Sequence, residues 1–540
     1  MRVPVCNNCH PLRTISQLPV DFRRAADGAG LAVVRSVLAT LLSAAVVGID
    51  ATIVQVEVDV TPGLPSFTMV GLPDAAVRES RDRVRTAIRN SGFEFPWQRI
   101  TINLAPTDVR KEGAAYDLPI ALGLLAATGM LPSRDVPDLL VVGALSLDGR
   151  VQATGGVLPV AIAGARSGIA SLMVPAANAP EAGVVAGLAV WPVTTLAEAA
   201  DVIINGSGRA GVSQDPVAIQ DDGIAVWGDF SDVRGQPLAR RALEVAAAGG
   251  HHVLLTGPPG SGKTMMARRL AGILPPLSFD EALEATSIHS VAGLLPAGTG
   301  LLTARPFRAP HHTISDVALV GGGTHPRPGE LSLAHGGVLF LDEMPEFERR
   351  ALEVLRQPLE EGVIRIARAA RAVEFPARVT LVGAMNPCPC GYFGHPLRPC
   401  RCTPPQRERY AARISGPLLD RIDLAVDVSW IPPDVLGDDR PQESSAAIRS
   451  RVIKARGRQS DRRSEAGVLL NGGLRGRALR NLARPDAAGR ELLDAAVRRL
   501  ALSGRAHDRI LRVARTIADL GGHATVTSDH VAEAIQYRLS

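Results

Sequence analysis

The chain has 540 residues, a length that allows about three or four domains. Its composition, 46% hydrophobic and 21% charged, is that of a globular protein, and an aromatic content of 4% argues against binding of single strands chiefly by base stacking. The net charge of +5 is uneven, because residues 440–540 contain 20 Lys and Arg but only 10 Asp and Glu. Such a basic end is typical either of a protein with a polyanionic partner or of solvated helix faces.

Residues 1–30 differ in character from the rest of the chain. Cys6, Cys9 and His10 form a C-x-x-C-H pattern that formally matches c-type haem attachment, but haem proteins of that type are exported. The apolar residues 31–49 imitate a signal peptide, yet Arg35 interrupts them and no cysteine framework for disulfides follows. We therefore expect a disordered extension over 1–30 in a cytoplasmic protein that has no membrane partner.

Residues 31–204 have the pattern of an α+β domain. Apolar residues that alternate at 53–60 predict a strand, and further strands are expected at 99–104 and 139–142. Asp74 is placed to cap a helix that runs to about Asn90, with an apolar face and, on another face, a row of arginines: Arg78, Arg81, Arg85 and Arg89. We interpret this basic face as solvated. A stretch rich in Gly, Ser, Asp and Gln then predicts a linker at 205–228.

The most specific motif lies at 257–264, where the sequence fits G-x-x-x-x-G-K-[ST]. An apolar run before it and a helical pattern after it, at 265–274, supply the strand–loop–helix context that a phosphate-binding loop requires. The glycines let several backbone N–H groups point at one phosphate beside a helix N-terminus. We expect Lys263 to reach the β- and γ-phosphates and Thr264 to ligate Mg²⁺. The predicted ATP site consists of Gly257, Pro258, Pro259, Gly260, Ser261, Gly262, Lys263 and Thr264.

An acidic element of the kind that a nucleotide site needs follows at 338–343. Four apolar residues, typical of a strand buried on both faces, precede Asp342 and Glu343. We predict that Asp342 holds Mg²⁺ and that Glu343 polarises the attacking water as general base. The competing interpretation is a buried strand that ends in an exposed acidic turn.

Four cysteines stand close together as two C-x-C pairs across a turn that contains Gly and Pro. Four thiolates in such a turn can surround a structural zinc ion, so we predict a Zn²⁺ site formed by Cys388, Cys390, Cys400 and Cys402. Disulfides, which the cytosol disfavours, and free thiols are the alternatives. We further hypothesise that nearby arginines meet the phosphates of DNA: Arg398, Arg401, Arg407 and Arg409.

Residues 143–150 and 155–157, together with 111–113, resemble the proteolytic domain of Lon proteases, which has a ribosomal S5 domain 2-like fold. In that domain a serine attacks the peptide and a lysine activates it. The matching positions here are Ala115 and Leu158, which can supply neither a nucleophile nor a base. The resemblance therefore implies a Lon-like fold over 31–204 without the protease.

Further segments, at 232–236, 305–313 and 328–335, resemble the ComM/YifB group of magnesium-chelatase-like ATPases, as do the P-loop and the helical C-terminus. The resemblance runs from about residue 31 to the C-terminus. It implies an AAA+ P-loop core over 229–435 with a zinc-binding insertion at 388–402, and a helical lid over 436–540. It also implies a hexamer that acts as a branch-migration helicase on DNA.

The same resemblance assigns roles to three residues outside the nucleotide motifs. Asn386, at the end of the apolar residues 380–385, matches the sensor-1 position, which holds the lytic water or the γ-phosphate. Arg421 matches an arginine finger that enters the neighbouring subunit's site, and the alternative is a structural pairing with Asp420 or Asp423. Arg512 matches sensor 2, which reaches the nucleotide of its own subunit from the lid.

Helical spacing at 491–502, 505–520 and 528–538 predicts the helices of this lid. The adjacent His311 and His312 suggest a metal site by themselves, but loop histidines are more often ordinary surface residues.

These features predict a mixed α/β and α+β multidomain protein, a cytoplasmic AAA+ ring ATPase that moves branched or single-stranded DNA. The alternative is a chelatase-type ATPase that remodels a protein partner for metal insertion. A non-enzymatic ATP switch would not need both Glu343 and Arg421. A Lon-like protease would lack its catalytic pair.

Overall fold

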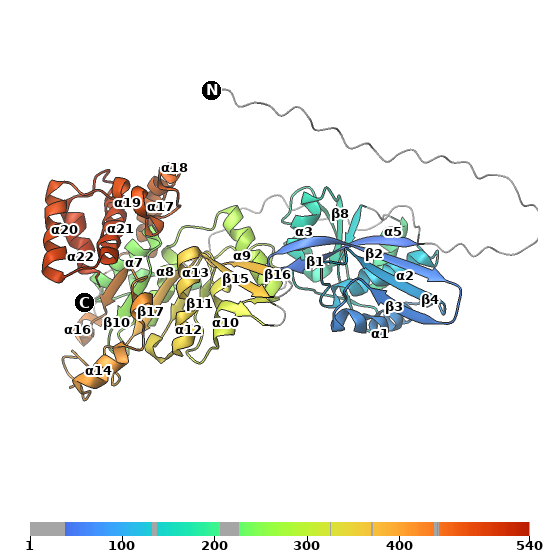
Figure 1. Ribbon diagram of the computed structural model, residues 1–540, viewed down its shortest axis with the longest axis horizontal. Coiled ribbons are helices and arrows are strands. Elements are labelled where there is room, and N and C mark those ends of the chain that lie inside the picture. Colours follow the sequence, from blue (N-terminus) through green and yellow to red (C-terminus); the bar gives the residue numbers. More distant parts are fainter. Residues whose placement is uncertain are drawn as a thin grey trace, which may run out of the picture. The chain divides into compact units, whose positions relative to one another are not determined.

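The computed structural model describes residues 38–131, 138–205, 226–296, 298–323, 326–368, 371–436, 440 and 442–538. The predicted extension over 1–30, with its C-x-x-C-H pattern, and most of the predicted linker at 205–228 lie outside these residues. The described part has the predicted mixed α/β architecture and a helical C-terminal part, coloured orange to red in Figure 1. Within it, no helix combines the length and the apolar character needed to cross a bilayer.

The N-terminal domain is built on a seven-stranded mixed sheet with the strand order β3-β4-β2-β1-β5-β8-β9. The strand predicted at 53–60 is confirmed inside β2, where Val54, Val56 and Val58 are buried as the alternation predicts. The strands of this sheet are β1 (Ala39–Val47), β2 (Asp50–Thr61), β3 (Ser66–Val70), β4 (Arg99–Ala105), β5 (Leu139–Val141), β8 (Ser171–Pro175) and β9 (Ala189–Val193).

Helices cover both faces of this sheet, because successive side chains of a strand point to opposite sides. Val141 of β5 joins the apolar cluster under α1 (Ala75–Asn90) and α2 (Asp117–Ala127), whereas Leu140 joins the cluster under α3 (Val157–Arg166). The N-cap predicted for α1 is confirmed, since Asp74 Oδ1 accepts the Val77 N–H at 2.8 Å. The smaller elements are β6 (Ala144–Leu145), β7 (Val151–Gln152), η1 (Ala114–Tyr116), η2 (Ala176–Asn178), α4 (Ala179–Ala182) and α5 (Leu196–Asn205).

The following domain contains a five-stranded, wholly parallel sheet with the order β11-β14-β17-β10-β18. Its strands are β10 (Val253–Thr256), β11 (Phe307–Arg308), β14 (Val338–Leu341), β17 (Thr380–Met385) and β18 (Leu424–Asp427). The buried runs predicted at 338–341 and 380–385 are confirmed as β14 and β17. Because parallel strands end at the same edge, the segments that follow β10, β14 and β17 meet there.

Short helices and two hairpins surround this sheet. The helices are η3 (Phe230–Asp232), α7 (Pro237–Gly249), α8 (Lys263–Ile273), α9 (Phe279–Ala292), α10 (Asp316–Val320), α11 (Glu330–Leu333), η4 (Met344–Glu346), α12 (Arg349–Glu353), α13 (Arg356–Glu361), α14 (Pro404–Ala411) and α15 (Gly416–Leu419). The hairpins pair β12 (Gly321–Gly322) with β13 (Arg327–Pro328) and β15 (Val363–Arg368) with β16 (Arg371–Pro376).

The C-terminal part is helical, as predicted. Its first predicted helix is confirmed with shifted ends: α20 begins where Asp486 accepts the Gly489 N–H and ends before Ala501, which has a left-handed φ of 49°. The helices are α16 (Pro433–Leu436), α17 (Ser445–Asp461), α18 (Arg463–Ala466), η5 (Asn471–Gly473), α19 (Gly476–Leu482), α20 (Ala487–Leu500), α21 (Gly504–Gly521) and α22 (Ser528–Gln536). Apolar residues of α17 and α21 share one buried cluster with β10 and α7.

Candidate functional site

The loop at 257–264 joins β10 to α8, so the strand–loop–helix context predicted for it is confirmed. At two positions of the loop, the backbone conformation or the space available favours glycine over any residue with a side chain. Gly262 caps α8 in the left-handed region with a φ of 90°, and a Cβ on Gly257 would lie 2.2 Å from the carbonyl oxygen of Val428. A loop of this shape directs backbone N–H groups and a helix N-terminus toward one point, an arrangement that binds anions.

The loop borders a cavity of about 440 Å³, a volume typical of small-molecule sites. The residues that line it are Pro259, Gly260, Ser261, Gly262, Lys263, Thr264, Met265, Asp342, Glu343, Met385 and Asn386. The fold therefore brings nine of the predicted site residues to one place, although they come from three separate segments of the sequence. Gly257 and Pro258, which were also predicted, do not line the cavity. The two methionines were not predicted, because an apolar residue at the end of a helix or strand has no distinctive pattern.

Lys263 is buried at the base of this cavity. Its Nζ donates to the carbonyl oxygens of Gly257 at 2.7 Å and Pro258 at 3.0 Å, and lies 3.3 Å from Asn386 Oδ1. Burial lowers the pKa of Lys263, and the charges of Asp342 and Glu343 offset part of that effect. A bound phosphate would stabilise the ammonium form, so this lysine is suited to an anionic ligand.

Thr264 and Asp342 are in direct contact across the cavity. Thr264 Oγ1 donates to Asp342 Oδ2 at 2.8 Å, and the backbone N–H of Glu343 donates to Asp342 Oδ1 at 3.0 Å. A hydroxyl and a carboxylate at this separation are the oxygen ligands that Mg²⁺ prefers. The two predicted magnesium ligands therefore fit one ion.

Glu343 stands beside this pair with most of its carboxylate accessible. Its φ of 49° is left-handed, a conformation that is strained for a residue with a side chain and is frequent at functional sites. Its Oε2 lies 3.9 Å from Nδ1 of His312, whose ring is 4.1 Å from that of His311. Among the described residues, these histidines belong to no group able to hold a metal ion.

Arg421 does not line the cavity. It donates to Glu360 Oε2 at 2.6 Å and to the carbonyl oxygens of Arg356 and Pro417, each at 2.8 Å. The sequence suggested Asp420 or Asp423 as structural partners of Arg421, and this is wrong, because Arg421 pairs with Glu360. Arg421 remains a predicted arginine finger.

Arg512 is likewise held away from the cavity by a carboxylate. Its Nη2 donates to Asp423 Oδ1 at 2.9 Å, and Asp423 Oδ2 lies 2.9 Å from Nδ1 of the fully buried His251. The other ring nitrogen of His251 lies 2.7 Å from Thr516 Oγ1 of α21. Burial by itself would raise the pKa of Asp423, but the hydrogen bond to His251 and the charge of Arg512 hold that pKa below its ordinary value. No motif indicated this network.

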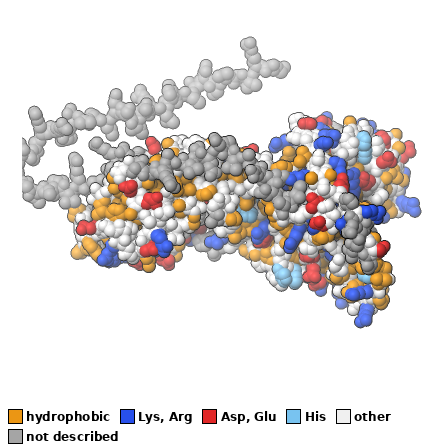
Figure 2. Space-filling model, turned by 180° about the vertical axis from the view of Figure 1, so that it is seen from behind, with side chains coloured by type: hydrophobic (Ala, Val, Ile, Leu, Met, Phe, Trp, Pro, Cys, Tyr) orange, Lys and Arg blue, Asp and Glu red, His pale blue; other side chains and the backbone are white. Residues whose placement is uncertain are grey.

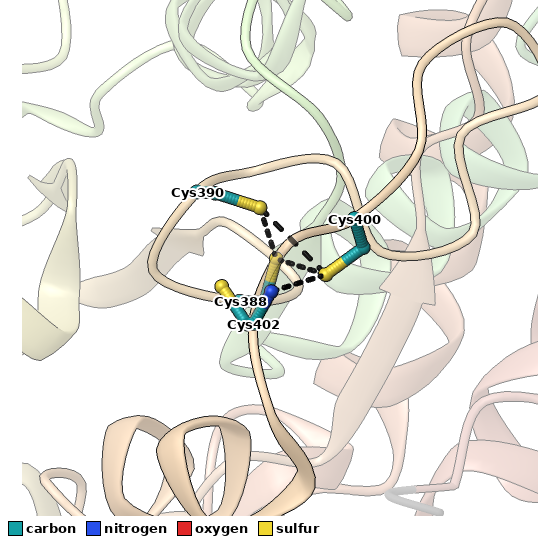
Figure 3. Close-up of side chains that lie close together, drawn as sticks. All are labelled: Cys388, Cys390, Cys400 and Cys402. Carbon is teal, nitrogen blue, oxygen red and sulfur yellow. Dashed lines mark hydrogen bonds between the residues drawn. The ribbon is translucent and has the colours of Figure 1, made fainter.

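The four cysteines predicted to bind zinc converge in the segment 388–402, hereafter the cysteine loop (Figure 3). Cys388 Sγ lies 3.4 Å from Cys390 Sγ and 3.6 Å from Cys400 Sγ, and all four sulfurs are within 4.8 Å of one another. Tetrahedral zinc with Zn–S bonds of about 2.3 Å separates its sulfurs by about 3.8 Å, so the cluster fits such an ion. Backbone hydrogen bonds from Arg401 and Tyr392 lower the pKa of Cys390 to about 6.

The cysteine loop contacts the phosphate-binding loop. A Cβ on Gly391 would lie 2.7 Å from Cδ of Pro259, and Gly391 has a φ of 82° that favours glycine. The outer side of the cysteine loop and the start of α14 are basic and aromatic, since Arg407 lies 4.0 Å from the ring centroid of Phe393 and Arg398 lies 5.3 Å from that of Tyr392. Of the four arginines predicted to meet phosphates, two are thus stacked on rings.

The positions that correspond to the Lon catalytic pair are structural. Ala115 lies in η1, and the side chain of Leu158 is completely buried in the first turn of α3. Lys111 is also fully buried, with its Nζ donating to the carbonyl oxygen of Pro106. Neither Ala115 nor Leu158 has a side chain that could act as a nucleophile or a base.

Comparison with known proteins identifies the family. Three family models match in succession: subunit ChlI of magnesium chelatase at 56–178, "Magnesium chelatase, subunit ChlI" at 229–435, and the ChlI C-terminal model at 442–538. YifB of Escherichia coli is 44% identical over 495 residues, which is 92% of this chain and 96% of that protein. Competence protein ComM of Haemophilus influenzae is 42% identical over 506 residues, which is 93% and 97% of the two chains. The chain belongs to the ComM/YifB family of magnesium-chelatase-like proteins.

Two weaker relatives match parts of this family member. The magnesium-chelatase 38 kDa subunit of Rhodobacter capsulatus is 26% identical over 353 residues, 58% of this chain and 86% of that protein. Lon protease 3 of Sorangium cellulosum is 28% identical over 140 residues, 25% of this chain and 17% of that protein. The central domain is therefore a magnesium-chelatase-like AAA+ core followed by a helical domain, and the likeness to Lon is weak.

Proposed function

We propose that this family member is an ATP-hydrolysing ring motor that acts on DNA, as a branch-migration helicase in recombination or natural transformation. One observation carries the proposal: five groups suited to ATP hydrolysis line one cavity of a chain that is 42% identical to a competence protein over 93% of its length. The five groups are Lys263, Thr264, Asp342, Glu343 and Asn386.

Each of these groups has a role that its position supports. Lys263 and the N–H groups of the loop bind the β- and γ-phosphates of ATP, while Thr264 and Asp342 hold Mg²⁺. When bound, the magnesium ion neutralises negative charge on the phosphates. Glu343 takes a proton from the attacking water, and Asn386 orients that water against the γ-phosphate. Water displaces ADP from the γ-phosphoryl group, which leaves as inorganic phosphate.

In the proposed hexamer, Arg421 enters the neighbouring subunit's site and Arg512 approaches the nucleotide of its own subunit. Both arginines contact carboxylates in the single chain, Glu360 and Asp423 respectively. Guanidinium groups held by carboxylates can exchange them for phosphate oxygens of like charge and geometry. Ring assembly and ATP binding would provide those oxygens.

The remaining parts of the proposal concern zinc, DNA and the N-terminal domain. The spacing of the four sulfurs supports a structural Zn²⁺ in the cysteine loop. The arginines of that loop and of α14 support contacts with DNA phosphates. The seven-stranded N-terminal domain is proposed to have a Lon-like fold without protease activity, because Ala115 and Leu158 carry no catalytic group.

The alternative is a magnesium-chelatase-like ATPase that remodels a protein partner for metal insertion. The similarity to the Rhodobacter capsulatus subunit, 26% over 353 residues, favours it. This alternative uses the same ATP chemistry, but it predicts a stable complex with a protein partner and an ATPase activity that DNA does not stimulate.

Steady-state ATPase activity of the full chain tests the proposal, measured without DNA and with single strands, duplex and four-way junctions. We expect stimulation that is strongest with junctions. Glu343→Gln should lower the DNA-stimulated rate at least about 100-fold, because it removes the general base. Glu346→Gln, in η4 close by, is the matched control and should retain the activity. ATPase activity that no DNA changes would reject the DNA motor in favour of the remodelling function.

A further inference from the structure

The N-terminal domain carries a second basic surface that the ATP site and the cysteine loop do not explain. It is centred on one row of α1, hereafter the α1 arginine stripe: Arg78, Arg81, Arg85 and Arg89. Intervals of three and four residues place these arginines on one side of the helix, next to the face that buries Val77, Val84 and Ile88. The stripe extends along about 16 Å of helix, a length over which one strand of B-DNA carries about five phosphates.

The charges of the stripe are available to a partner. The other arginine of α1, Arg83, is used inside the fold, where its Nε and Nη2 donate to the two oxygens of the buried Asp117 at 2.8 and 3.0 Å. Within the described part of the chain, no ion pair of 4.0 Å or less joins an arginine of the stripe to a carboxylate. The acidic residues of α1 are Glu79, which lies 4.0 Å from Arg83, and the exposed Asp82 at the edge of the stripe.

Two of these arginines lie over aromatic rings from outside α1. The Arg85 guanidinium carbon is 4.6 Å from the ring centroid of Trp97, and that of Arg81 is 5.8 Å from the ring centroid of Phe67 in the edge strand β3. Trp97 is 60% exposed although Arg85 covers it and Phe95 meets it edge-on at 6.3 Å. An indole that two neighbours orient while most of its surface remains accessible is a ready platform for a planar group.

Solvation explains a basic helix face, but it does not explain an oriented and exposed tryptophan beside that face. The carboxylates of an acidic peptide would satisfy the charges yet would not by themselves stack on the ring. Phosphates with bases attached satisfy both, since unpaired bases stack on aromatic side chains while arginines bind the backbone.

We propose that the α1 arginine stripe and Trp97 form a nucleic-acid-binding surface on the N-terminal domain, where the arginines contact phosphates and Trp97 stacks on an unpaired base. The surface is selective for single-stranded segments over duplex, because stacked and paired bases do not present their faces. This inference rests on the proposed action on DNA. It gives the N-terminal domain its own binding site for a DNA strand, separate from the ATP-hydrolysing core.

Fluorescence anisotropy with the full-length chain and labelled oligothymidine, over a range of salt concentrations, tests the surface. We expect Arg81→Gln/Arg85→Gln/Arg89→Gln to weaken binding at least about tenfold and to reduce the slope of log K against log[salt] by about 2, at about 0.7 for each lost phosphate contact. Trp97→Ala should weaken binding of oligothymidine about tenfold with an unchanged salt slope, should leave duplex binding unchanged, and should be rescued by Trp97→Phe.

The matched control is Arg110→Gln/Arg150→Gln/Arg166→Gln, which removes three exposed arginines of the same domain that do not belong to the stripe. All variants should keep the basal ATPase rate, since none of these residues lies at the ATP site. Equal loss of binding in the stripe variant and the control, or oligothymidine binding at the wild-type level in the stripe variant, would overturn the inference while leaving the DNA motor intact. A wild-type chain that binds no DNA would instead remove the proposed function itself.

Discussion

At the scale of single residues, Asp423 connects the P-loop domain to the C-terminal helices. It is 6% exposed, and its two oxygens contact His251, just before β10, and Arg512 of α21. A buried carboxylate between two basic groups is strongly favoured only while all partners are present, because removal of one leaves uncompensated charge. The same contact holds Arg512, so Asp423 affects both stability and the proposed sensor.

We predict that Asp423→Asn lowers the free energy of unfolding by about 3 kcal/mol at neutral pH, measured by urea unfolding. The pKa of Asp423 is lower in the folded chain than in the unfolded one. The contribution of ionised Asp423 to the free energy of unfolding is therefore fully present above the unfolded pKa of about 3.9. It is lost as the pH falls through and below that value. The difference between wild type and variant should thus shrink in acid. Asp427→Asn, on the exposed end of β18, is the control and should change the stability little.

The residues of the ATP site could be predicted because their spacing is itself the signal. A phosphate-binding loop and an acidic pair after an apolar run identify Lys263, Thr264, Asp342 and Glu343 without any coordinates. The contact between Asp423 and His251 could not be predicted. Neither residue belongs to a recognisable motif, and the two are distant in the sequence. For the same reason the partner of Arg421 was predicted wrongly: Glu360 lies 61 residues away.

At the scale of elements, the cysteine loop is placed to influence the ATP site. Gly391 contacts Pro259 of the phosphate-binding loop, and Asn386, which lines the ATP cavity, immediately precedes the loop in sequence. A cluster that keeps the cysteine loop in one conformation therefore also fixes a wall of the cavity. The sequence predicted the cluster from its C-x-C pairs, but the contact with Pro259 depends on how the chain folds back.

We predict that Gly391→Ala reduces the ATPase rate at least about tenfold while the chain retains about one zinc per molecule by elemental mass spectrometry. The added methyl group would lie 2.7 Å from Cδ of Pro259, so the phosphate-binding loop must move. Gly394→Ala is a matched control, because Gly394 has a similar φ of 78° and a Cβ there would meet nothing within 4 Å. Equal activity of the two variants would show that the contact with Pro259 has no role. Loss of zinc from Gly391→Ala would mean that the substitution acts on the cluster itself.

At the scale of the whole molecule, the mixed α/β architecture and the helical C-terminal part were predictable, and the details of the sheets were not. Hydrophobic periodicity located β14, β17 and the last three helices, because the buried residues of each element follow one regular spacing in the sequence. It located neither α17, whose apolar residues are diluted by arginines, nor the sheet order, which depends on pairings between distant strands. Figure 2 illustrates why charge alone is a poor guide, since Lys and Arg are scattered over both described domains on that face. The α1 arginine stripe stands out only when Trp97 and Phe67 are placed beside it.

If the protein acts as a ring, two different inactive variants should restore each other's ATPase activity when they are mixed. If Arg421 acts in the neighbouring subunit's site, a site needs Glu343 from one chain and Arg421 from the next. Glu343→Gln and Arg421→Ala should each be inactive alone, yet a one-to-one mixture should regain up to about a quarter of the wild-type ATPase rate, because random assembly pairs the two intact residues at about one interface in four.

The control mixture combines Glu343→Gln with Lys263→Ala, whose defects both lie on the same chain's side of a site. An active site needs intact Lys263 and Glu343 from the same chain. Each chain of this mixture lacks one of the two, so the mixture should stay inactive. Arg421→Ala must also keep the wild-type free energy of urea unfolding to within about 1 kcal/mol, since a salt bridge with a half-exposed carboxylate such as Glu360 contributes little. A mixture of Glu343→Gln and Arg421→Ala that remains inactive, although both variants assemble, would place Arg421 in its own subunit's structure and remove the finger from the mechanism.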